Sequence, residues 1–425
     1  MLESGQAYTV TIEECNIFAN GVCHIDNMVV FVPNTLQGEE CEITITKVMP
    51  TYAFARCDKI ISPSNKRQVP ACKVYNECGG CSFLHMNIEE ENYIKNKYVK
   101  NAFKKQKIEA DFEKTVSPVC EKYRNKVVLF FDGNDFGYMK EGTNQIVKHH
   151  TCNLNPDVFD KIASFTKEHI KSNNLRALYL RKSSHSVPEI MVCPIFYKST
   201  DISTFVKDIT NEFPQIKSIL VSSYEKSDFA LEKLTFKAVY GNGYINDEIC
   251  GVNFRISPES FYQINHPCAT LLYEKAIELA DAKKGTLCAD LFCGTGTIGI
   301  IIAKKTGAEV NGVEIVKSAV EDARFNATQN GIANATFEAC DAKAFNKKTD
   351  VCIIDPPRKG CSQLMLNTLL RLKPKRIVYV SCNTDTLTRD LKILLNDYKI
   401  SSPVSVFNMF PRTKHVESVV CLTRE

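Results

Sequence analysis

The sequence predicts a three-part protein whose C-terminal part is a Rossmann-like α/β domain. Two observations predict that domain. An apolar run at residues 286–292 leads into a glycine-rich turn at 293–299 and then into a helix-like segment. Three further strand-like runs follow, and each ends beside an acidic residue. Upstream, about 60 residues rich in β-formers predict a small barrel, and a mixed α+β segment joins the two parts.

Residues 1–61 are predicted to form an OB-like β-barrel. Three runs of β-formers, separated by turn signals, predict its strands: residues 8–12, 28–32 and 41–46. The segment resembles the TRAM domain, an RNA-binding module, in Phe31-Val32-Pro33 and in Gly38-Glu39-Glu40. The resemblance implies that this barrel contacts RNA.

Residues 62–255 are predicted to form a central α+β domain with metal-binding cysteines. Cys72, Cys78 and Cys81 follow the spacing C-x5-C-x2-C. A closed tetrahedral metal site or a cubane cluster needs four thiolates, and Cys152 is the best candidate for the fourth. The spacing alone leaves zinc and a [4Fe–4S] cluster equally open.

Two basic segments of the central domain are candidates for RNA contact. A helix is predicted between Asn87 and Lys107, with Asn87 as its N-cap, and six lysines from Lys95 onward have no acid between them. These lysines form either a solvated face or a phosphate-binding one. The stronger candidate is Tyr123-Arg124-Asn125-Lys126, because an aromatic ring beside two cations can both stack on bases and neutralise phosphates.

The C-terminal domain, residues 256–425, carries the signature of a nucleotide-type cofactor pocket. Gly294 and Gly296 let the backbone approach a ligand closely, and the helix that follows begins with free N–H groups. Four acids occur at successive strand ends, where open α/β sheets bind ligands: Asp290, Glu314, Asp341 and Asp355. Together with Pro356-Pro357, this set favours S-adenosyl-L-methionine over NAD.

A cysteine and a carboxylate at two later strand ends form the predicted catalytic pair. Cys382 closes one strand-like run, and Glu417 opens the next. A thiolate adds readily to an electron-poor ring carbon, and a carboxylate can remove the proton that must leave later. The residue after the Asp-Pro-Pro sequence is Arg358, where adenine-amino methyltransferases usually carry an aromatic residue. The pair therefore favours carbon 5 of a uracil as the methylated atom.

In these motifs the chain resembles the RNA uracil-carbon-5 methyltransferases, in particular their iron–sulfur branch with an N-terminal TRAM domain. The matching segments keep the family's order: residues 261–265, 290–296, 355–360, 381–383 and 415–418. The resemblance implies a class I methyltransferase fold with Cys382 as nucleophile, Glu417 as base, and a [4Fe–4S] cluster on the four cysteines. It also implies six cofactor-pocket residues: Gln263, Phe292, Thr297, Glu314, Asp341 and Asp355. At Thr297 and Asp341 the family commonly has asparagine.

Composition sets the remaining expectations. The chain of 425 residues is long enough for three domains, and its net charge of only +4 predicts that RNA affinity comes from basic patches. Nineteen cysteines, an odd number spread over the chain, indicate a reducing cytosol. No segment predicts a membrane span or a signal peptide. We therefore expect a cytoplasmic enzyme that works as a monomer.

The sequence leaves alternatives open for both the substrate and the reaction. The barrel and the cysteine motif resemble the branch acting on ribosomal RNA more than the branch acting on tRNA, so we expect a uridine of 23S rRNA as the target. The alternatives are a tRNA uridine, methylation of another atom by the same fold, and a non-catalytic RNA-binding assembly factor.

Overall fold

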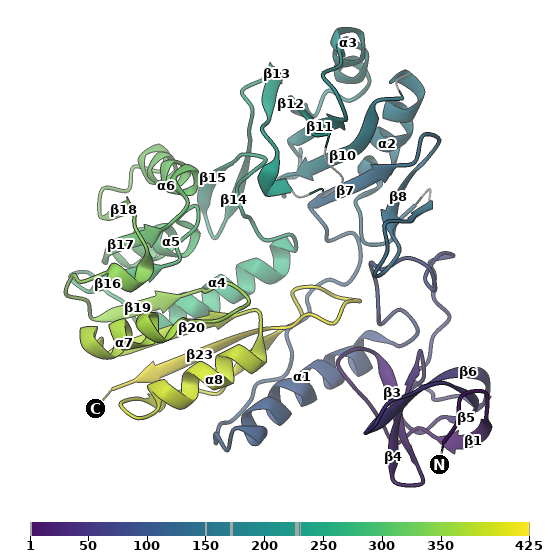
Figure 1. The fold of residues 1–425 in the computed structure, drawn as a ribbon. Coiled ribbons are helices and arrows are strands. Elements are labelled where there is room, and N and C mark those ends of the chain that lie inside the picture. The colour runs from purple at the N-terminus through teal and green to yellow at the C-terminus, as the bar shows by residue number, and fades with distance from the viewer. Residues whose placement is uncertain (1, 149–150, 171–172, 226–228, 230, 425) are drawn as a thin grey trace.

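The structure is a computed structural model, and it describes residues 2–148, 151–170, 173–225, 229 and 231–424. Figure 1 shows an N-terminal barrel, a central sheet with two helices, and a C-terminal sheet with helices on both faces. Helix α1 (Ile88–Lys105) lies between the barrel and the C-terminal sheet. No helix in the described ranges combines the length and the apolar composition that crossing a membrane requires.

The barrel is one curved sheet with strand order β1-β5-β6-β4-β3-β2. Its strands are β1 (Ala7–Thr11), β2 (Glu14–Cys15), β3 (Asn20–Ile25), β4 (Met28–Pro33), β5 (Glu40–Val48) and β6 (Tyr52–Ser62). Side chains alternate across a strand, so Val30 and Val32 of β4 and Ala53 and Ala55 of β6 fill the interior. The residues between them point outward, away from the barrel core.

The central sheet has seven strands in the order β13-β12-β11-β10-β7-β8-β9. Its elements are β7 (Lys126–Phe131), β8 (Phe136–Met139), β9 (Ile146–Lys148), α2 (Asp157–His169), β10 (Leu175–Lys182), β11 (Ile190–Phe196), α3 (Ser203–Glu212), β12 (Ile216–Ser223), η1 (Leu231–Lys233) and β13 (Lys237–Gly241). Helices α2 and α3 cover one face through residues such as Phe159 and Phe205. Tyr179 and Met191 on the other face join the core of the C-terminal domain, so the two domains share apolar packing.

The C-terminal sheet has the order β18-β17-β16-β19-β20-β23-β21, with β22 also paired to β23. Its strands are β16 (Leu287–Leu291), β17 (Glu309–Glu314), β18 (Ala335–Ala339), β19 (Val351–Ile354), β20 (Arg376–Ser381), β21 (Lys399–Ile400), β22 (Ser405–Phe407) and β23 (Glu417–Thr423). The first five strands in spatial order are parallel, and β23 is antiparallel to β20. The chain reverses its winding between β16 and β19, which opens a crevice at their carboxyl ends. This topology confirms the predicted Rossmann-like fold.

Helices cover both faces of this sheet. The remaining elements are the hairpin β14 (Ile245–Ile249) and β15 (Val252–Ile256), and α4 (His266–Ala280), α5 (Thr297–Thr306), α6 (Lys317–Gln329), η2 (Ala342–Ala344), α7 (Gln363–Leu372) and α8 (Thr384–Leu394). Helices α4, α5 and α6 pack on one face, and α7 and α8 pack on the other.

Helix α1 confirms the predicted helix and its cap. The Asn87 side chain accepts a hydrogen bond of 2.9 Å from the backbone N–H of Glu90. Although α1 falls in the range assigned to the central domain, its Val99 and Phe103 pack in the same apolar cluster as Leu387 of α8. Helix α1 thus extends one face of the C-terminal domain toward the barrel.

Candidate active site

A tight turn follows β16 at the edge of the crevice. Phe292, Gly294 and Gly296 all have positive φ angles, of 70°, 54° and 79°. A Cβ atom on Gly296 would lie 2.9 Å from the ring of Phe337, so only glycine fits there. The turn brings the backbone N–H groups at the start of α5 to the carboxyl end of β16. This is the usual arrangement for holding a nucleotide-like ligand.

The side chain of Asp290 on β16 anchors that turn through a hydrogen bond. It is 2 % exposed, and its Oδ2 accepts a hydrogen bond of 2.8 Å from the backbone N–H of Gly299. Burial raises the pKa of Asp290 to about 7, an effect that the Gly299 hydrogen bond opposes and the charge of Glu314 reinforces. A carboxyl held this way fixes the first turn of α5 on the end of β16.

Glu314 fixes the turn from the next strand. Its Oε2 accepts a hydrogen bond of 3.2 Å from the N–H of Gly294, and its Oε1 accepts bonds of 2.8 and 3.0 Å from Ile315 and Val316. The carboxylate is therefore oriented by backbone groups alone. Placed at the end of β17, it suits the hydroxyl groups of a ribose.

The other predicted cofactor residues differ in their surroundings. Thr297 is buried at the first position of α5, with its hydroxyl 3.3 Å from that of Thr295. Asp341 is half-exposed, and a hydrogen bond and ion pair with Lys343 lower its pKa. Gln263 is buried before α4, where its backbone carbonyl accepts a hydrogen bond of 2.9 Å from Asn125. Carboxylates, backbone N–H groups and the glycine cradle together fit S-adenosylmethionine.

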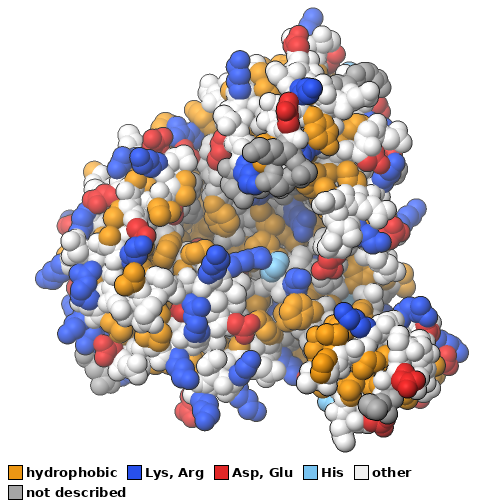
Figure 2. Space-filling view, viewed as in Figure 1, with side chains coloured by type: hydrophobic (Ala, Val, Ile, Leu, Met, Phe, Trp, Pro, Cys, Tyr) orange, Lys and Arg blue, Asp and Glu red, His pale blue; other side chains and the backbone are white. Residues whose placement is uncertain are grey.

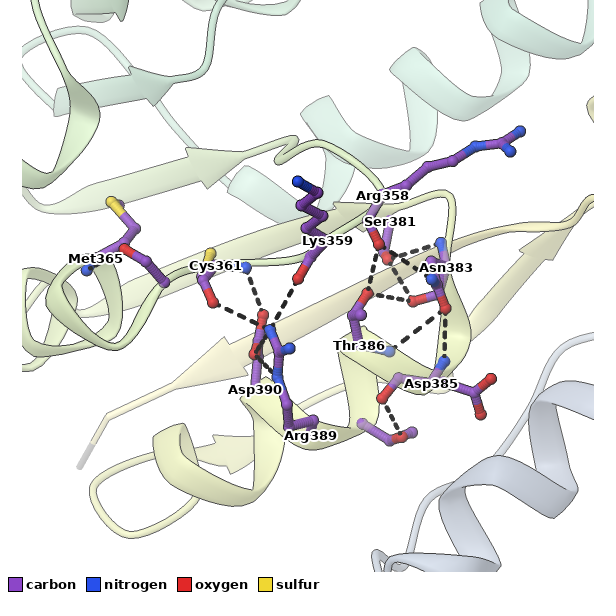
Figure 3. Close-up of polar contacts among 12 residues, drawn as sticks. Arg358, Lys359, Cys361, Met365, Ser381, Asn383, Asp385, Thr386, Arg389 and Asp390 are labelled. Carbon is purple, nitrogen blue, oxygen red and sulfur yellow. Dashed lines mark hydrogen bonds and ion pairs between the residues drawn. The ribbon is translucent and has the colours of Figure 1, made fainter.

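The loop after β19 is clamped onto α8 (Figure 3). Asn383 and Thr386 both donate hydrogen bonds to the backbone carbonyl of Arg358, at 3.0 and 3.3 Å. Gly360, with φ of 70°, lies so close to Arg389 that a Cβ atom would meet Nη2 at 2.7 Å. The Arg358 side chain itself points away from this clamp, and its Nη2 lies 3.3 and 3.4 Å from the two ring nitrogens of His415.

A buried carboxylate secures the same clamp. Asp390 of α8 accepts hydrogen bonds of 2.7 Å from the backbone N–H of Cys361 and from the hydroxyl of Tyr379. Tyr379 lies on β20, and Cys361 follows the Asp-Pro-Pro loop. One carboxylate therefore ties the loop, the strand and the helix that surround Cys382.

Cys382 and Glu417 lie beside the last residue pair of two antiparallel strands. The pairing of β20 with β23 ends at Ser381 and Ser418, so Cys382 directly follows one partner and Glu417 directly precedes the other. The charge of Glu417 acts on the Cys382 thiol, so the two groups lie near each other. Asn383 then caps α8 by accepting hydrogen bonds from Asp385 and Thr386. The strand end and the helix start together fix the position of Cys382, and its role as nucleophile stays a prediction.

Acidic neighbours shape the electrostatics of this pair. Burial, followed by the charges of Glu417 and Asp355, raises the pKa of the Cys382 thiol to about 11, whereas Arg358 lowers it. Burial and the charge of Asp355 raise the pKa of Glu417 well above its ordinary range. Burial also raises the pKa of Asp355, to about 7, and the charge of Asp290 adds to this. Burial and the neighbouring carboxyl groups therefore raise the pKa values of this pair, and Arg358 is a cation that opposes the rise at both Cys382 and Glu417.

Cys382 opens into a pocket of about 210 Å³ between three parts of the molecule. Its walls include Ile17 and Phe18 from the barrel, Tyr98 from α1, and Arg358, Lys414 and His415 from the C-terminal domain. Figure 2 shows a hollow where these parts meet, with Lys or Arg side chains and a histidine along its margin. Burial and the charge of Arg358 lower the pKa of His415 to about 4, so the cations of this pocket are Arg358 and Lys414.

Sequence reasoning missed the barrel and α1 walls of this pocket. Ile17, Phe18 and Tyr98 carry no motif and lie far from Cys382 in sequence. The structure leaves the Phe18 ring 60 % exposed, a feature that the sequence does not record.

A buried charge network holds the loop that leads to Glu417. Lys95 is completely buried, and its Nζ donates hydrogen bonds of 2.9 and 2.6 Å to Glu91 Oε1 and Asn408 Oδ1. Arg412 donates its backbone N–H to Glu91 at 2.9 Å and its side chain to the carbonyl of Met86 at 2.9 Å. The prediction that Lys95 is a solvated or phosphate-binding residue is therefore wrong, because it ties α1 to the C-terminal loop.

The second RNA-contact prediction is also wrong for its aromatic residue. Tyr123 is only 4 % exposed, and its hydroxyl donates a hydrogen bond of 2.9 Å to the carbonyl of Pro411. Its ring cannot stack on a base. Together with Ser82, whose N–H donates to the Arg412 carbonyl at 2.6 Å, it braces the same loop.

The four cysteines of the predicted metal site line one small cavity, with Arg124 beside them: Cys72, Cys78, Cys81 and Cys152. Burial raises the pKa of Cys81 to about 12, although the Arg124 charge opposes this. Within the part of the chain that the structure describes, no three His, Cys, Asp or Glu residues are arranged to hold a metal ion. The metal therefore stays a prediction.

Two family descriptions match the chain. Residues 282–406 match a methyltransferase domain, and residues 2–57 match a TRAM domain. The first match covers the crevice and β20, and the second covers most of the barrel. The predicted pairing of a TRAM barrel with a methyltransferase domain is thereby confirmed.

Full-length relatives extend the match to the whole chain. RNA methyltransferases of Oceanobacillus iheyensis and Listeria innocua are 32 % and 33 % identical, over 99 % and 100 % of this chain and 97 % and 99 % of their own. A tRNA (uracil-54, C5)-methyltransferase of Pyrococcus abyssi, solved with S-adenosyl-L-homocysteine, is 28 % identical with a TM-score of 0.81. That match covers 98 % of this chain and 99 % of the archaeal one.

Proposed function

The chain belongs to the RNA methyltransferase family, and we propose that it transfers a methyl group from S-adenosylmethionine to carbon 5 of a uridine in RNA. The observation that carries this proposal is the proximity of Cys382 and Glu417 beside the last residue pair of β20 and β23. A nucleophile and a base that lie close together suit a ring carbon that must be activated and then deprotonated. The archaeal relative solved with S-adenosyl-L-homocysteine is named for the same reaction on tRNA.

The reaction follows from the two side chains. The Cys382 thiolate adds to carbon 6 of the uracil, which forms a C–S bond and makes carbon 5 nucleophilic. S-adenosylmethionine supplies the methyl group and, when bound, one positive charge close to the acidic residues. Glu417 then removes the proton from carbon 5, and the electron pair re-forms the ring double bond as the C–S bond breaks. The thiolate is released unchanged.

The surrounding groups support this assignment. Burial near Asp355 raises the pKa of Glu417 well above its ordinary range, which makes the ionised carboxylate more basic. Burial and the nearby carboxylates raise the pKa of Cys382 to about 11, and Arg358 is the nearby cation that opposes this rise. Gln263 and Asp355 would orient the uracil, and Asp290, Glu314, Thr297 and Phe292 would hold the cofactor with the Gly294–Gly296 turn. Asp341 would contribute at the edge of the same crevice.

The target uridine has to leave any helix to reach the thiol. Inside a duplex, neighbouring bases cover both ring carbons, so the base must be extruded or lie in a loop. The pocket beside Cys382 has walls from the barrel and α1, and it has two cations, Arg358 and Lys414, for phosphates. This arrangement suits one unstacked nucleotide and its backbone.

The four cysteines Cys72, Cys78, Cys81 and Cys152 would hold a [4Fe–4S] cluster. Four thiols around one cavity with apolar walls, including Tyr75, Leu84 and Tyr138, form the donor set that such a cluster requires. The resemblance to the iron–sulfur branch of the family supports the cluster over zinc. The cluster would link the segment before α1 to the segment before α2.

Two RNA classes are candidate substrates. The barrel and the cysteine motif support a uridine of 23S rRNA, whereas the relative from Pyrococcus abyssi acts, by its name, on uracil 54 of tRNA. We propose rRNA as the substrate, modified by a monomer in the cytoplasm. The odd number of cysteines, 19, supports the reducing compartment.

Methylation of defined RNA tests the proposal. The purified protein is incubated with S-adenosylmethionine and with unmodified 23S rRNA or tRNA transcripts, and nucleosides are analysed by mass spectrometry. The proposal predicts 5-methyluridine in rRNA. 5-Methyluridine found only in tRNA would show that tRNA, not rRNA, is the substrate. A methyl group on another atom would contradict the proposed chemistry. RNA binding without methylation would favour a non-catalytic assembly factor.

A further inference from the structure

Three aromatic rings gather on the outer face of the barrel. Phe31 of β4 and Tyr52 and Phe54 of β6 have ring centroids 5.5 to 5.8 Å apart. The neighbouring positions Val30 and Ala53 already fill the barrel interior. The rings therefore contribute little to the core of the barrel, and their place on its outer surface calls for another explanation.

A fourth ring extends this cluster toward the catalytic pocket. Phe18 is 60 % exposed at the tip of a tight turn. The Asn16 side chain holds that turn by accepting hydrogen bonds of 2.9 and 3.1 Å from the N–H groups of Phe18 and Asn20, and Ala19 has a positive φ of 60°. The turn closes without any contribution from the Phe18 ring, which is presented in a fixed position.

The four rings lie along one groove, which we call the aromatic groove. Its other walls are Asn16, Asn20, Ser82, Glu141 and Lys414, and its volume is about 480 Å³. Phe18 and Lys414 also line the pocket of Cys382, so the groove and the pocket are neighbours that share these two residues. Figure 2 shows hydrophobic side chains gathered on the barrel, with Lys and Arg side chains close by.

The chemistry of the groove suits unpaired nucleotides. Lys414 Nζ lies 5.5 Å from the centroid of the Phe18 ring, a cation beside an aromatic face. The one carboxylate, Glu141, is 3.7 Å from the same Lys414. Bases of single-stranded RNA stack on aromatic rings while cations contact their phosphates. A duplex cannot use these rings, because its bases are already stacked on one another.

We propose that the aromatic groove is a second RNA subsite, which binds unpaired nucleotides adjoining the target uridine by stacking their bases on Phe18, Phe31, Tyr52 and Phe54. The inference rests on the proposed function only in taking the substrate to be RNA. The groove holds the flanking strand while its neighbour enters the pocket of Cys382. The enzyme thereby selects uridines in unpaired segments.

Fluorescence anisotropy with two labelled probes tests this inference. The probes are a ten-nucleotide oligouridylate, which does not pair with itself, and a ten-base-pair RNA duplex, both at fixed salt and with the full-length protein. We expect Phe18→Ala combined with Tyr52→Ala to weaken oligouridylate binding by about tenfold or more, because each stacked base contributes substantially. Duplex binding should change less than about twofold.

Two further variants keep the test decisive. Ile61→Ala removes an apolar side chain of β6 that is 42 % exposed and outside the groove, and it should leave both affinities unchanged. Phe18→Leu alters an exposed ring without disturbing the barrel core, keeps apolar volume and removes the π face. We expect it to weaken oligouridylate binding about fivefold. Unchanged binding in Phe18→Leu, or equal losses for both probes in the double variant, would overturn the inference.

The binding assay separates this inference from the proposed function. It needs neither S-adenosylmethionine nor turnover. If the protein forms 5-methyluridine while both groove variants bind oligouridylate normally, the reaction stands and the aromatic groove is refuted. If the variants lose binding while no 5-methyluridine forms, the groove stands and the proposed reaction fails.

Discussion

Two parts of the active site are built differently. The first is the row of acidic strand ends and the glycine turn proposed to bind the cofactor, which we call the cofactor edge. The second is the pocket beside Cys382, which we call the catalytic pocket. The edge consists of consecutive strand ends between Asp290 and Asp355, and its main groups are held by backbone N–H groups. The pocket combines Cys382 with Ile17 of the barrel and Tyr98 of α1. The edge is thus complete within one domain, whereas the pocket forms only when three parts of the molecule are packed together. The difference predicts separate sensitivities to mutation.

The largest expected effect is the loss of methyl transfer in a variant of the catalytic pocket that leaves the cofactor edge unchanged. Cys382→Ala should reduce methyl transfer by on the order of 10⁴-fold, since no other group there can add to the ring. The dissociation constant for S-adenosylmethionine, measured by calorimetry, should stay within about twofold. Cys120→Ala, a half-buried cysteine outside the site, serves as the control. Normal turnover of Cys382→Ala would contradict the nucleophile assignment.

The next effect tests what holds the pocket together. Lys95→Met removes one of the two cations beside the buried Glu91 carboxylate, the other being Arg412 Nη1 at 3.5 Å, and breaking a buried ion pair typically costs about 3–5 kcal/mol. We expect a clear fall in the urea midpoint. Lys97→Met is the control, because its ion pair with Glu14 is largely exposed and should change stability by less than about 1 kcal/mol. Equal effects of both variants would show that the buried network does not secure the loop.

A third effect concerns the edge, and it depends on pH. Asp290 has a pKa of about 7 in the folded protein against an ordinary value of 3.8. The folded state therefore binds this proton more tightly, and the stability that it contributes is lost as pH rises from about 4 to 7. Asp290→Asn should stabilise the protein at pH 8, by up to about 4 kcal/mol, and should have little effect near pH 4.

Asp341 supplies a control of opposite sign. Its pKa is lowered by Lys343, so its contribution is present at neutral pH and is lost as pH falls below its ordinary value. Asp341→Asn should therefore bring no gain in melting temperature at pH 8. A gain at pH 8 for Asp341→Asn, or none for Asp290→Asn, would contradict the electrostatic account of the edge.

The smallest effect concerns the α1 wall of the pocket. The Tyr98 hydroxyl donates a hydrogen bond of 2.9 Å to Asp385 Oδ2 at the pocket surface. Because this bond is exposed, Tyr98→Phe should raise the KM for RNA by less than about threefold and leave kcat unchanged. Steady-state kinetics on one RNA substrate measure both constants. A tenfold fall in kcat would mean that α1 takes part in the chemistry.

The same contrast explains which features could be predicted from the sequence. The placement of the acids was predictable because each lies at or near the carboxyl end of an apolar strand, and Cys382 follows such a strand whereas Glu417 begins one. Such patterns are local, and a parallel sheet brings its strand ends together without further information. The N-cap Asn87 was likewise readable from neighbouring residues.

The failures all depend on distant partners. Lys95 resembles the surface lysines that follow it, and its burial depends on distant partners such as Asn408, 313 residues away, as well as on Glu91 of the same helix. The sequence around Tyr123 is typical of an RNA contact, but in the structure its hydroxyl donates a hydrogen bond to the carbonyl of Pro411. The aromatic rings of the barrel form a groove only because the barrel lies beside Lys414 of the C-terminal domain. No local pattern records these contacts.

The most direct measurement of the central claim uses Glu417→Gln. If Cys382 attacks first and Glu417 acts only after methyl transfer, the glutamine keeps the shape of the side chain but cannot take the carbon-5 proton. The variant incubated with RNA and S-adenosylmethionine should then form a covalent protein–RNA adduct that carries the methyl group. The adduct should appear as a slow band on a denaturing gel and disappear when Cys382→Ala is added. Normal turnover of Glu417→Gln, or loss of activity without any adduct, would contradict the proposed roles of these two residues.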